Sequence, residues 1–189
     1  MSLNLLKQIF FCFALMFPSF ELNAKKRSYG ILNQLAPELG LKDWIDGKGK
    51  KIDPIKLSDY RGQYIYLYFF QDWCPGCQKH GFPALRKLTN ALDSTGKIKF
   101  FAIQTVFEGR WFNTRKKLRA NQEKHNVYIP MAHDDGGESG ERSILMGKYR
   151  SGGTPWTVLI DPSGKVIFNG FHIDEDKLIS FFLKSQQKM

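Results

Sequence analysis

The sequence predicts an α/β protein with a central mixed β-sheet and helices on both faces. Two stretches, 64–70 and 98–106, are rich in aromatic and β-branched residues, as expected of strands buried in a core. Between them, over 82–92, apolar residues recur at helical spacing. The chain then ends with two strands around a tight turn, over 157–171, and an amphipathic helix. Strands that alternate with helices in this way form a sheet that the helices cover.

The segments before the first long strand are short. A strand at 44–45, a turn at 46–49 and a returning strand at 52–57 are expected to form an N-terminal hairpin. Upstream of the hairpin, Pro37 interrupts any helix over 31–41. We therefore expect the hairpin to be an extension of the main sheet.

An inserted unit separates the second long strand from the final hairpin. It is expected to contain a helix at 113–125, a strand at 127–131, an acidic Gly-rich loop at 133–141 and a short helix at 144–149. The basic residues from Arg115 to Arg119 are expected to face solvent, with partner docking as the alternative. After the final hairpin, Asp174 is expected to cap the last helix. The apolar stripe of that helix consists of Leu178, Ile179, Phe182 and Leu183.

The first residues have the features of a secretory signal peptide. Lys7 precedes nine uninterrupted apolar residues, 9–17, a run too short to span a bilayer. We therefore expect a signal peptide at 1–24, a basic lead-in at 25–35 and a single domain at 36–189, exported to the periplasm. The alternative is an uncleaved N-terminal anchor that holds the domain at the membrane, facing the periplasm.

The formal net charge of the chain is +10. No fingerprint of a nucleic-acid-binding fold accompanies this charge, so nucleic acid is not an expected partner. The charge predicts a solvated basic surface, with peripheral contact to an anionic membrane as the sharper alternative. We expect a monomer.

Cys74 and Cys77 are the only cysteines that remain after the predicted cleavage. A disulfide across so short a loop adds little stability, so the pair is better explained by function than by scaffolding. If a helix begins at Cys74, its N-terminus favours a thiolate there, and Pro75 occupies the first helical position. Cys77 then lies about one turn later on the same face, close enough to form a disulfide.

Two segments resemble thioredoxin-fold proteins. The segment 66–77, Tyr-Leu-Tyr-Phe-Phe-Gln-Asp-Trp-Cys-Pro-Gly-Cys, resembles their active-site strand and loop, and 153–166 resembles their cis-proline loop and following hairpin. The segments 36–37 and 57–62 resemble the N-terminal extension of the exported TlpA/ResA-like redoxin branch, which also resembles peroxiredoxins. The similarity extends over most of 36–184 and implies a thioredoxin-like fold with a helix/strand insert before the cis-proline hairpin.

The resemblance implies a thiol–disulfide oxidoreductase that needs no cofactor and no metal. Cys74 would attack a substrate disulfide, and Cys77 would resolve the mixed disulfide that results. Thr154 and a cis Pro155 would bind the substrate beside the Cys pair, and Trp73 would shield the site. The expected partners are protein dithiol or disulfide substrates and an upstream electron donor. The neutral dipeptide between the cysteines favours a reductant, including the cytochrome-maturation type, over a strong oxidant.

Three positions depart from the pattern of the family. Tyr68 stands where thioredoxins carry a buried acid, and His80 stands where TlpA/ResA-like proteins often carry a Glu. Pro83 comes one residue late because Gly81 is extra, so a one-residue bulge is expected in the helix. His80 is a candidate proton acceptor for Cys77, although the bulge could turn it away. The alternative is a surface or helix-packing histidine.

The competing non-enzyme hypothesis is a thioredoxin-like copper carrier. It would use the two cysteines with a distant histidine, either His133 or His172, but copper-delivery relatives usually space their cysteines by three residues. A one-cysteine peroxidase is disfavoured, because peroxidase sites usually have a Thr three residues before the cysteine and this chain has none there. His125 and His172 are expected to be ordinary surface residues. A solvated turn without a calcium-loop spacing is expected for Asp134, Asp135, Glu138 and Glu141.

Overall fold

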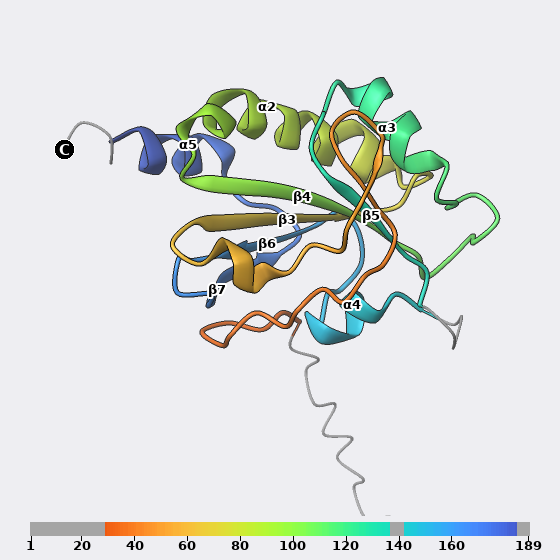
Figure 1. Cartoon of the computed structure of the whole chain (residues 1–189), viewed down its shortest axis with the longest axis horizontal. Helices are drawn as coiled ribbons and strands as arrows, with labels where there is room; N and C mark the ends of the chain where they lie inside the picture. Colours follow the sequence, from red (N-terminus) through yellow and green to blue (C-terminus); the bar gives the residue numbers. More distant parts are fainter. Residues whose placement is uncertain (1–28, 137–141, 185–189) are drawn as a thin grey trace, which may run out of the picture.

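The computed structural model describes residues 29–136 and 142–184, which form a seven-stranded sheet in the order β2-β1-β5-β4-β3-β6-β7. Its centre is β3 (Tyr64–Phe70), which pairs in parallel with β4 (Ile98–Thr105) and antiparallel with β6 (Trp156–Ile160). Figure 1 shows these strands side by side in the middle of the molecule. The predicted mixed sheet is therefore confirmed, with β3 at the expected residues.

The other strands extend the sheet at its two edges. On one side β5 (Met131–Asp134) runs parallel to β4. The predicted hairpin, β1 (Trp44–Ile45) and β2 (Lys51–Ile52), continues the sheet antiparallel to β5. On the other side β7 (Val166–Gly170) pairs antiparallel with β6.

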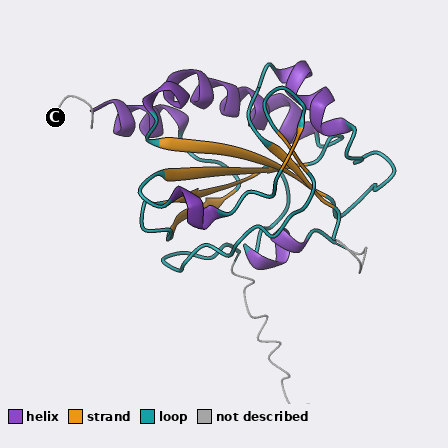
Figure 2. Cartoon of the chain, viewed as in Figure 1, coloured by secondary structure: helices purple, strands orange, loops and turns teal. Residues whose placement is uncertain are grey.

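Helices cover both faces of the sheet, as expected (Figures 1 and 2). One face carries α2 (Phe82–Leu92), α3 (Lys117–His125) and α5 (Glu175–Lys184), and the other carries α4 (Ile144–Lys148). Because β3 is covered on both sides, its even-numbered residues pack in the core under α2 and its odd-numbered residues pack in the core on the α4 face. Within the described residues, no helix is long and apolar enough to cross a bilayer.

The packed chain begins before residue 36, where the sequence placed the start of the domain. Ile31 is 7% exposed and belongs to the core on the α4 face. The N–H of Asn33 donates to the carbonyl of Val166 at 2.9 Å, which ties the segment to β7. The expected signal peptide and the basic residues up to 28 lie outside the described residues.

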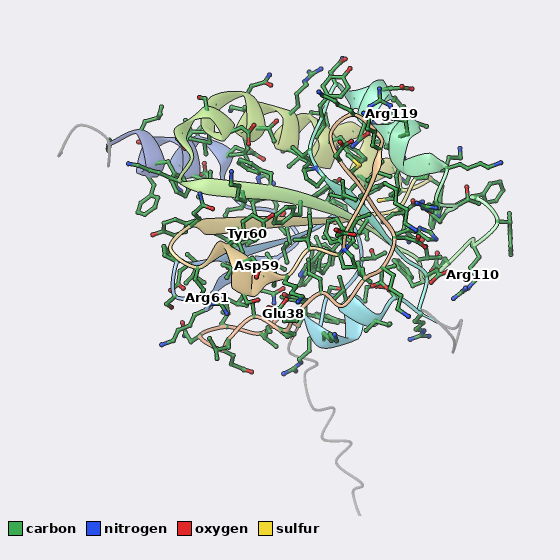
Figure 3. All side chains as sticks on the ribbon, viewed as in Figure 1. Glu38, Asp59, Tyr60, Arg61, Arg110 and Arg119 are labelled. Carbon is green, nitrogen blue, oxygen red and sulfur yellow. The ribbon has the colours of Figure 1, made fainter. Side chains whose placement is uncertain are left out.

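The expected strand over 52–57 is wrong beyond Ile52. Pro54 lacks the N–H that a strand ladder needs, and the next element is the 3-10 helix η1 (Leu57–Tyr60). The Glu38 carboxylate accepts hydrogen bonds from the backbone N–H groups of Leu57 and Ser58, at 2.8 and 2.9 Å. In Figure 3, Glu38 lies beside this segment, so the N-terminal extension supports the start of η1.

Three other predicted boundaries or surfaces differ. The expected strand over 127–131 lies instead at 131–134, because Pro130 cannot donate to a ladder. The expected helix over 113–125 starts only at Lys117, since the Asn113 side chain is buried in other hydrogen bonds. Leu183, predicted in the apolar stripe of α5, is 41% exposed.

Candidate active site

The dithiol lies where β3 gives way to a helix. A turn over 71–74 closes through a hydrogen bond from the N–H of Cys74 to the carbonyl of Gln71, at 3.2 Å. Helical backbone then begins at Pro75, as predicted. The N–H of Cys77 donates to the sulfur of Cys74 at 3.2 Å, which is the bond that an N-cap side chain makes with the third helical residue. Cys74 therefore caps the helix with its sulfur.

The two thiols are free and differ in environment. Cys77 is 0% exposed and Cys74 is only 6% exposed, so both thiols are buried, whereas the family resemblance implies an exposed Cys74. The pKa of Cys74 falls to about 6, first through its hydrogen bond with the Cys77 thiol and then through bonds from the Thr154 side chain and from the backbone N–H groups of Cys77 and Gly76. Burial, and next the same bond with Cys74, raises the pKa of Cys77 far above its usual value. The geometry thus prepares one thiolate and one thiol.

The second wall of the site comes from the start of β6. The Thr154–Pro155 peptide bond is cis. The Cys74 thiol donates to the carbonyl of Thr154 at 3.5 Å. A Cβ at Gly76 would lie 3.1 Å from the ring of Pro155, so a side chain at this position would crowd the proline. The structure therefore brings together the Cys pair and the predicted Thr154–Pro155 segment.

The helix after the dithiol contains the expected extra residue. Residues Cys77–Gly81 form a single π-turn, η2, in which the N–H of Phe82 donates to the carbonyl of Cys77. This turn absorbs the extra glycine, and Pro83 then falls in the first turn of α2 without breaking it.

Tyr68 was treated in the sequence only as a missing acid, yet its side chain belongs to the site. Its hydroxyl donates to the carbonyl of Cys77 at 3.3 Å. Burial, followed by the nearby Cys77 thiol, raises the pKa of Tyr68 well above its usual value, so the hydroxyl stays protonated. The one signal in the sequence was the extra Gly81, which makes room for this hydroxyl.

His80 lies on the outer side of the π-turn. It is exposed and lines a cavity of about 440 Å³ that also contacts Tyr68, Gly76 and Pro155. Within the described residues, no hydrogen bond joins His80 to either sulfur. Proton acceptance by His80 therefore stays a prediction.

Asn113 holds the loop after β4 against the active-site turn. Its side-chain oxygen accepts the N–H of Asp72 at 2.7 Å, and its side-chain nitrogen donates to the Gln71 side chain at 3.1 Å and the Glu108 carbonyl at 3.0 Å. Asn113 is 1% exposed, so these bonds form in the interior. The sequence contained no local signal for this role, because the active-site turn lies about forty positions away.

Asp72 lies two positions before Cys74 in the sequence, and its carboxylate is paired with residues of α3. Lys117 forms an ion pair with its carboxylate at 3.0 Å, and the Asn121 side chain donates to it at 2.8 Å. This arrangement weakens the repulsion that Asp72 would otherwise exert on a Cys74 thiolate. At least one residue of the basic cluster therefore supports the site directly.

Other members of the basic cluster make local contacts. Arg119, labelled in Figure 3, donates to the Gly47 carbonyl at 3.3 Å and lies over the Tyr128 ring. Arg115 lies 3.4 Å from the carboxylate of Asp43.

Exposed aromatic side chains gather beside the Cys pair. Trp73 is 45% exposed, and Trp111 and Phe112, from the loop that Asn113 holds, are 76% and 57% exposed. A Cβ at Gly109 would lie 3.5 Å from both Trp73 and Phe112, so both side chains lie close to Gly109. Trp73 was predicted at the site from the sequence, whereas Trp111 and Phe112 were not.

Of two groups predicted at the surface, His125 is half-buried and Asp134 is buried. His125 stacks on Phe82 at 4.1 Å and bonds to the side chain of Gln78 at 2.8 Å, so it packs against the active-site helix. Asp134 is 1% exposed, and its carboxylate accepts bonds from Ser143 and from the N–H groups that open α4. It caps a helix rather than forming part of a solvated turn. Glu138 and Glu141 lie outside the described residues.

The copper-carrier hypothesis needs a cluster of metal-binding side chains, and the described part of the chain contains none. There, no three His, Cys, Asp or Glu side chains come close enough to hold a metal ion. His133 and His172 therefore do not join the Cys pair.

The fold and the site define a thioredoxin-like dithiol protein. The AhpC/TSA family model matches residues 32–169, and the chain belongs to that family. Peroxiredoxin Bcp of Bacillus subtilis (strain 168) is 32% identical over 144 residues, which cover 72% of this chain and 82% of that protein. A thiol-disulfide oxidoreductase ResA of Bacillus cereus is 27% identical over 122 residues, or 65% of this chain and 61% of ResA.

Solved structures agree with this class. The thioredoxin-like superfamily protein SPOA0173 superposes with a TM-score of 0.68 at 29% identity, covering 80% of this chain and 94% of that one. A thiol-disulfide isomerase from Corynebacterium glutamicum has the same TM-score at 27% identity, covering 81% and 95%. The protein is thus a thiol–disulfide oxidoreductase of the thioredoxin-like class.

Proposed function

We propose that this protein reduces disulfides of extracytoplasmic proteins by dithiol exchange through Cys74 and Cys77. The observation that carries the proposal is the pair itself: a helix-capping thiol with a pKa near 6 beside a buried thiol one turn away. The thiolate is the nucleophile in this chemistry, so Cys74 is the group ready to attack. The extracytoplasmic location is proposed from the predicted signal peptide at residues 1–24, which lie outside the described residues.

In the proposed cycle, the Cys74 thiolate attacks a substrate disulfide and one substrate sulfur leaves. The mixed disulfide is then resolved by Cys77, which releases the second substrate sulfur and leaves a Cys74–Cys77 disulfide. An upstream electron donor restores the dithiol. His80 is the proposed acceptor of the proton that Cys77 loses, because it lies on the same helical turn and lines the cavity beside Gly76 and Pro155.

A protein substrate fits the surroundings of the dithiol. Thr154 and Pro155 form the wall against which an extended substrate segment would lie. Trp73, which precedes Cys74 in the sequence, and Phe112 are exposed near Gly109, and the exposed Trp111 lies 5.9 Å from Phe112. Aromatic residues of this kind are enriched where proteins bind proteins.

Substrate trapping tests the proposal. The variant Cys77→Ser should stop at the mixed disulfide and retain a covalently bound protein, which reducing agent releases for identification. The matched variant Cys74→Ser should retain none, although it keeps one thiol in the site. Equal trapping by both variants, or failure of the unmodified protein to reduce insulin, would contradict the assignment.

Peroxide reduction is the second candidate, favoured by the identity to peroxiredoxin Bcp. It would need Cys74 to attack hydrogen peroxide, form a sulfenic acid and then a disulfide with Cys77. Gln71, not Thr, lies three residues before Cys74, which argues for disulfide exchange as the main activity. Comparing the rate constants of the reduced protein with hydrogen peroxide and with an insulin disulfide decides between the two.

A further inference from the structure

The hydroxyl of Tyr68 reaches the resolving cysteine from the central strand. Tyr68 is 1% exposed, and its ring stacks on Phe70 at 5.9 Å and meets Phe82 edge-on at 5.2 Å. Two aromatic neighbours therefore fix the direction of the ring. Its hydroxyl ends 3.3 Å from the carbonyl oxygen of Cys77.

Gly81 provides the space that this hydroxyl occupies. A Cβ at residue 81 would lie 2.1 Å from the Tyr68 oxygen and 2.7 and 2.9 Å from two ring carbons. The φ of Gly81 is −65°, an ordinary helical value, so the backbone conformation does not require glycine there. The requirement is for space, and Tyr68 is the side chain that fills it.

The π-turn presents the Cys77 carbonyl to two donors. In a regular α-helix this oxygen would accept the N–H four residues on, whereas here it accepts the N–H of Phe82, five residues on. Tyr68 supplies the second donor from another element. Because Cys77 is 0% exposed, no solvent hydrogen bond competes for the same oxygen.

We propose that Tyr68 and Gly81 together act as a lock on the resolving cysteine, with Tyr68 as a positioning residue. The hydroxyl holds the carbonyl of residue 77, and the held backbone directs the Cys77 sulfur toward Cys74. This inference rests on the proposed dithiol exchange and concerns its second step. Tyr68 touches no substrate atom in that step.

The chemistry of the second step is fully supplied by the dithiol. Cys77 loses its proton, its sulfur attacks the Cys74 sulfur of the mixed disulfide, and a new Cys74–Cys77 bond forms. The bond to the substrate breaks, and the substrate leaves as a thiolate that takes up a proton. Two electrons pass from the protein dithiol to the substrate disulfide over the two steps. If the Cys77 sulfur is less well directed toward the Cys74 sulfur, only the second step becomes slower.

The test uses Tyr68→Phe, with Tyr66→Phe as the matched control. Tyr66 lies two residues earlier on the same strand, is 2% exposed and lines the same cavity, but its hydroxyl bonds to Thr157 at 3.2 Å. The reduced proteins are mixed with 5,5′-dithiobis(2-nitrobenzoate) in a stopped-flow instrument. The first thionitrobenzoate released reports attack by Cys74, and the second reports resolution by Cys77.

We expect Tyr68→Phe to leave the first release unchanged and to slow the second about fivefold, the effect of one lost hydrogen bond. Tyr66→Phe should leave both releases unchanged. The inference is overturned if Tyr68→Phe slows neither release, if it slows both equally, or if Tyr66→Phe slows the second as much. Absence of any release from the unmodified protein would instead overturn the proposed function, and the inference with it.

Discussion

Two thiols one helical turn apart differ in acidity because their partners differ. Cys74 receives an N–H from the helix start and a hydrogen bond from the Cys77 thiol, and both favour its thiolate. Cys77 lies in the apolar interior beside Tyr68, where a charge is costly. The proposed roles of Cys74 as nucleophile and Cys77 as resolving thiol therefore follow from the hydrogen bonds and burial of each sulfur.

This difference predicts the pH dependence of alkylation. Only the thiolate reacts with iodoacetamide, and a lowered pKa means that the thiolate persists at lower pH. The alkylation rate of Cys74 should rise with pH to a plateau, with its midpoint near pH 6 instead of the usual thiol value of about 8.5.

The variant Cys77→Ala removes the largest single cause of the lowered pKa. In this variant the pH midpoint of Cys74 alkylation should move upward toward the usual thiol value. The helix N-terminus should still keep that midpoint below the usual value. Mass spectrometry of quenched samples gives the rates. A midpoint above pH 8 in the unmodified protein would contradict the assigned hydrogen bonds.

At the scale of elements, the π-turn η2 joins the dithiol to α2 and depends on Gly81. One extra residue between the second cysteine and Pro83 would disrupt a continuous α-helix, and the structure absorbs it in a single wider turn. The Tyr68 hydroxyl, from β3, donates a hydrogen bond to the Cys77 carbonyl at the start of this turn. The element is therefore stabilised by a neighbouring strand as well as by its own ladder.

Gly81→Ala should accordingly destabilise the fold. The added methyl group overlaps the Tyr68 ring, which the core holds on both sides, and overpacking of this kind costs about 1–3 kcal/mol. Gly147→Ala is the matched control, because Gly147 lies in α4 and a Cβ there would meet nothing within 4 Å. The control should be neutral or more stable by about 0.5–1 kcal/mol.

Urea denaturation of the reduced proteins measures both changes. If Gly81→Ala is as stable as Gly147→Ala, the side chain of Tyr68 must move freely, and the proposed lock does not exist.

At the scale of the whole molecule, the sheet order brings distant segments to one site. Because β6 pairs antiparallel with β3, the start of β6 lies next to the C-terminal end of β3. Thr154 therefore contacts Cys74, although the two are eighty positions apart in the sequence. The parallel neighbour β4 ends at the same edge, and the loop after it carries Asn113 and the exposed aromatics. The topology thus brings two distant loops to the dithiol.

The reduction potential is a property of this assembled site. A lowered Cys74 pKa stabilises the dithiol, but a value near 6 lies closer to the value of roughly 7 in reducing thioredoxins than to the roughly 3.5 of strong oxidants. We expect a potential more negative than about −200 mV, in the reducing half of the range from about −270 to about −120 mV. Equilibration with glutathione buffers, followed by alkylation of free thiols, measures it. A value near −120 mV, on the order of the strongest oxidants, would reverse the proposed direction of electron flow.

The sequence predicted the elements whose signals are local. The strand over 64–70, the helix start at Pro75 and the final hairpin follow from periodicity and turn residues within a short window. The predictions that failed involve longer-range partners: Pro130 shifted β5, and the Glu38 carboxylate supports a 3-10 helix where a strand was expected. Local patterns do not report such partners.

By itself the sequence determined the Cys-x-x-Cys dithiol, its place at a helix start and the one-residue excess before Pro83. Only the tertiary structure decided that Tyr68 bonds the resolving residue, that Asn113 holds the active-site turn and that Thr154 accepts the Cys74 thiol. The physical reason is that a hydrogen bond forms between atoms about 3 Å apart, whatever their separation along the chain. Periodicity shows which residues are buried, and packing alone shows which of them meet.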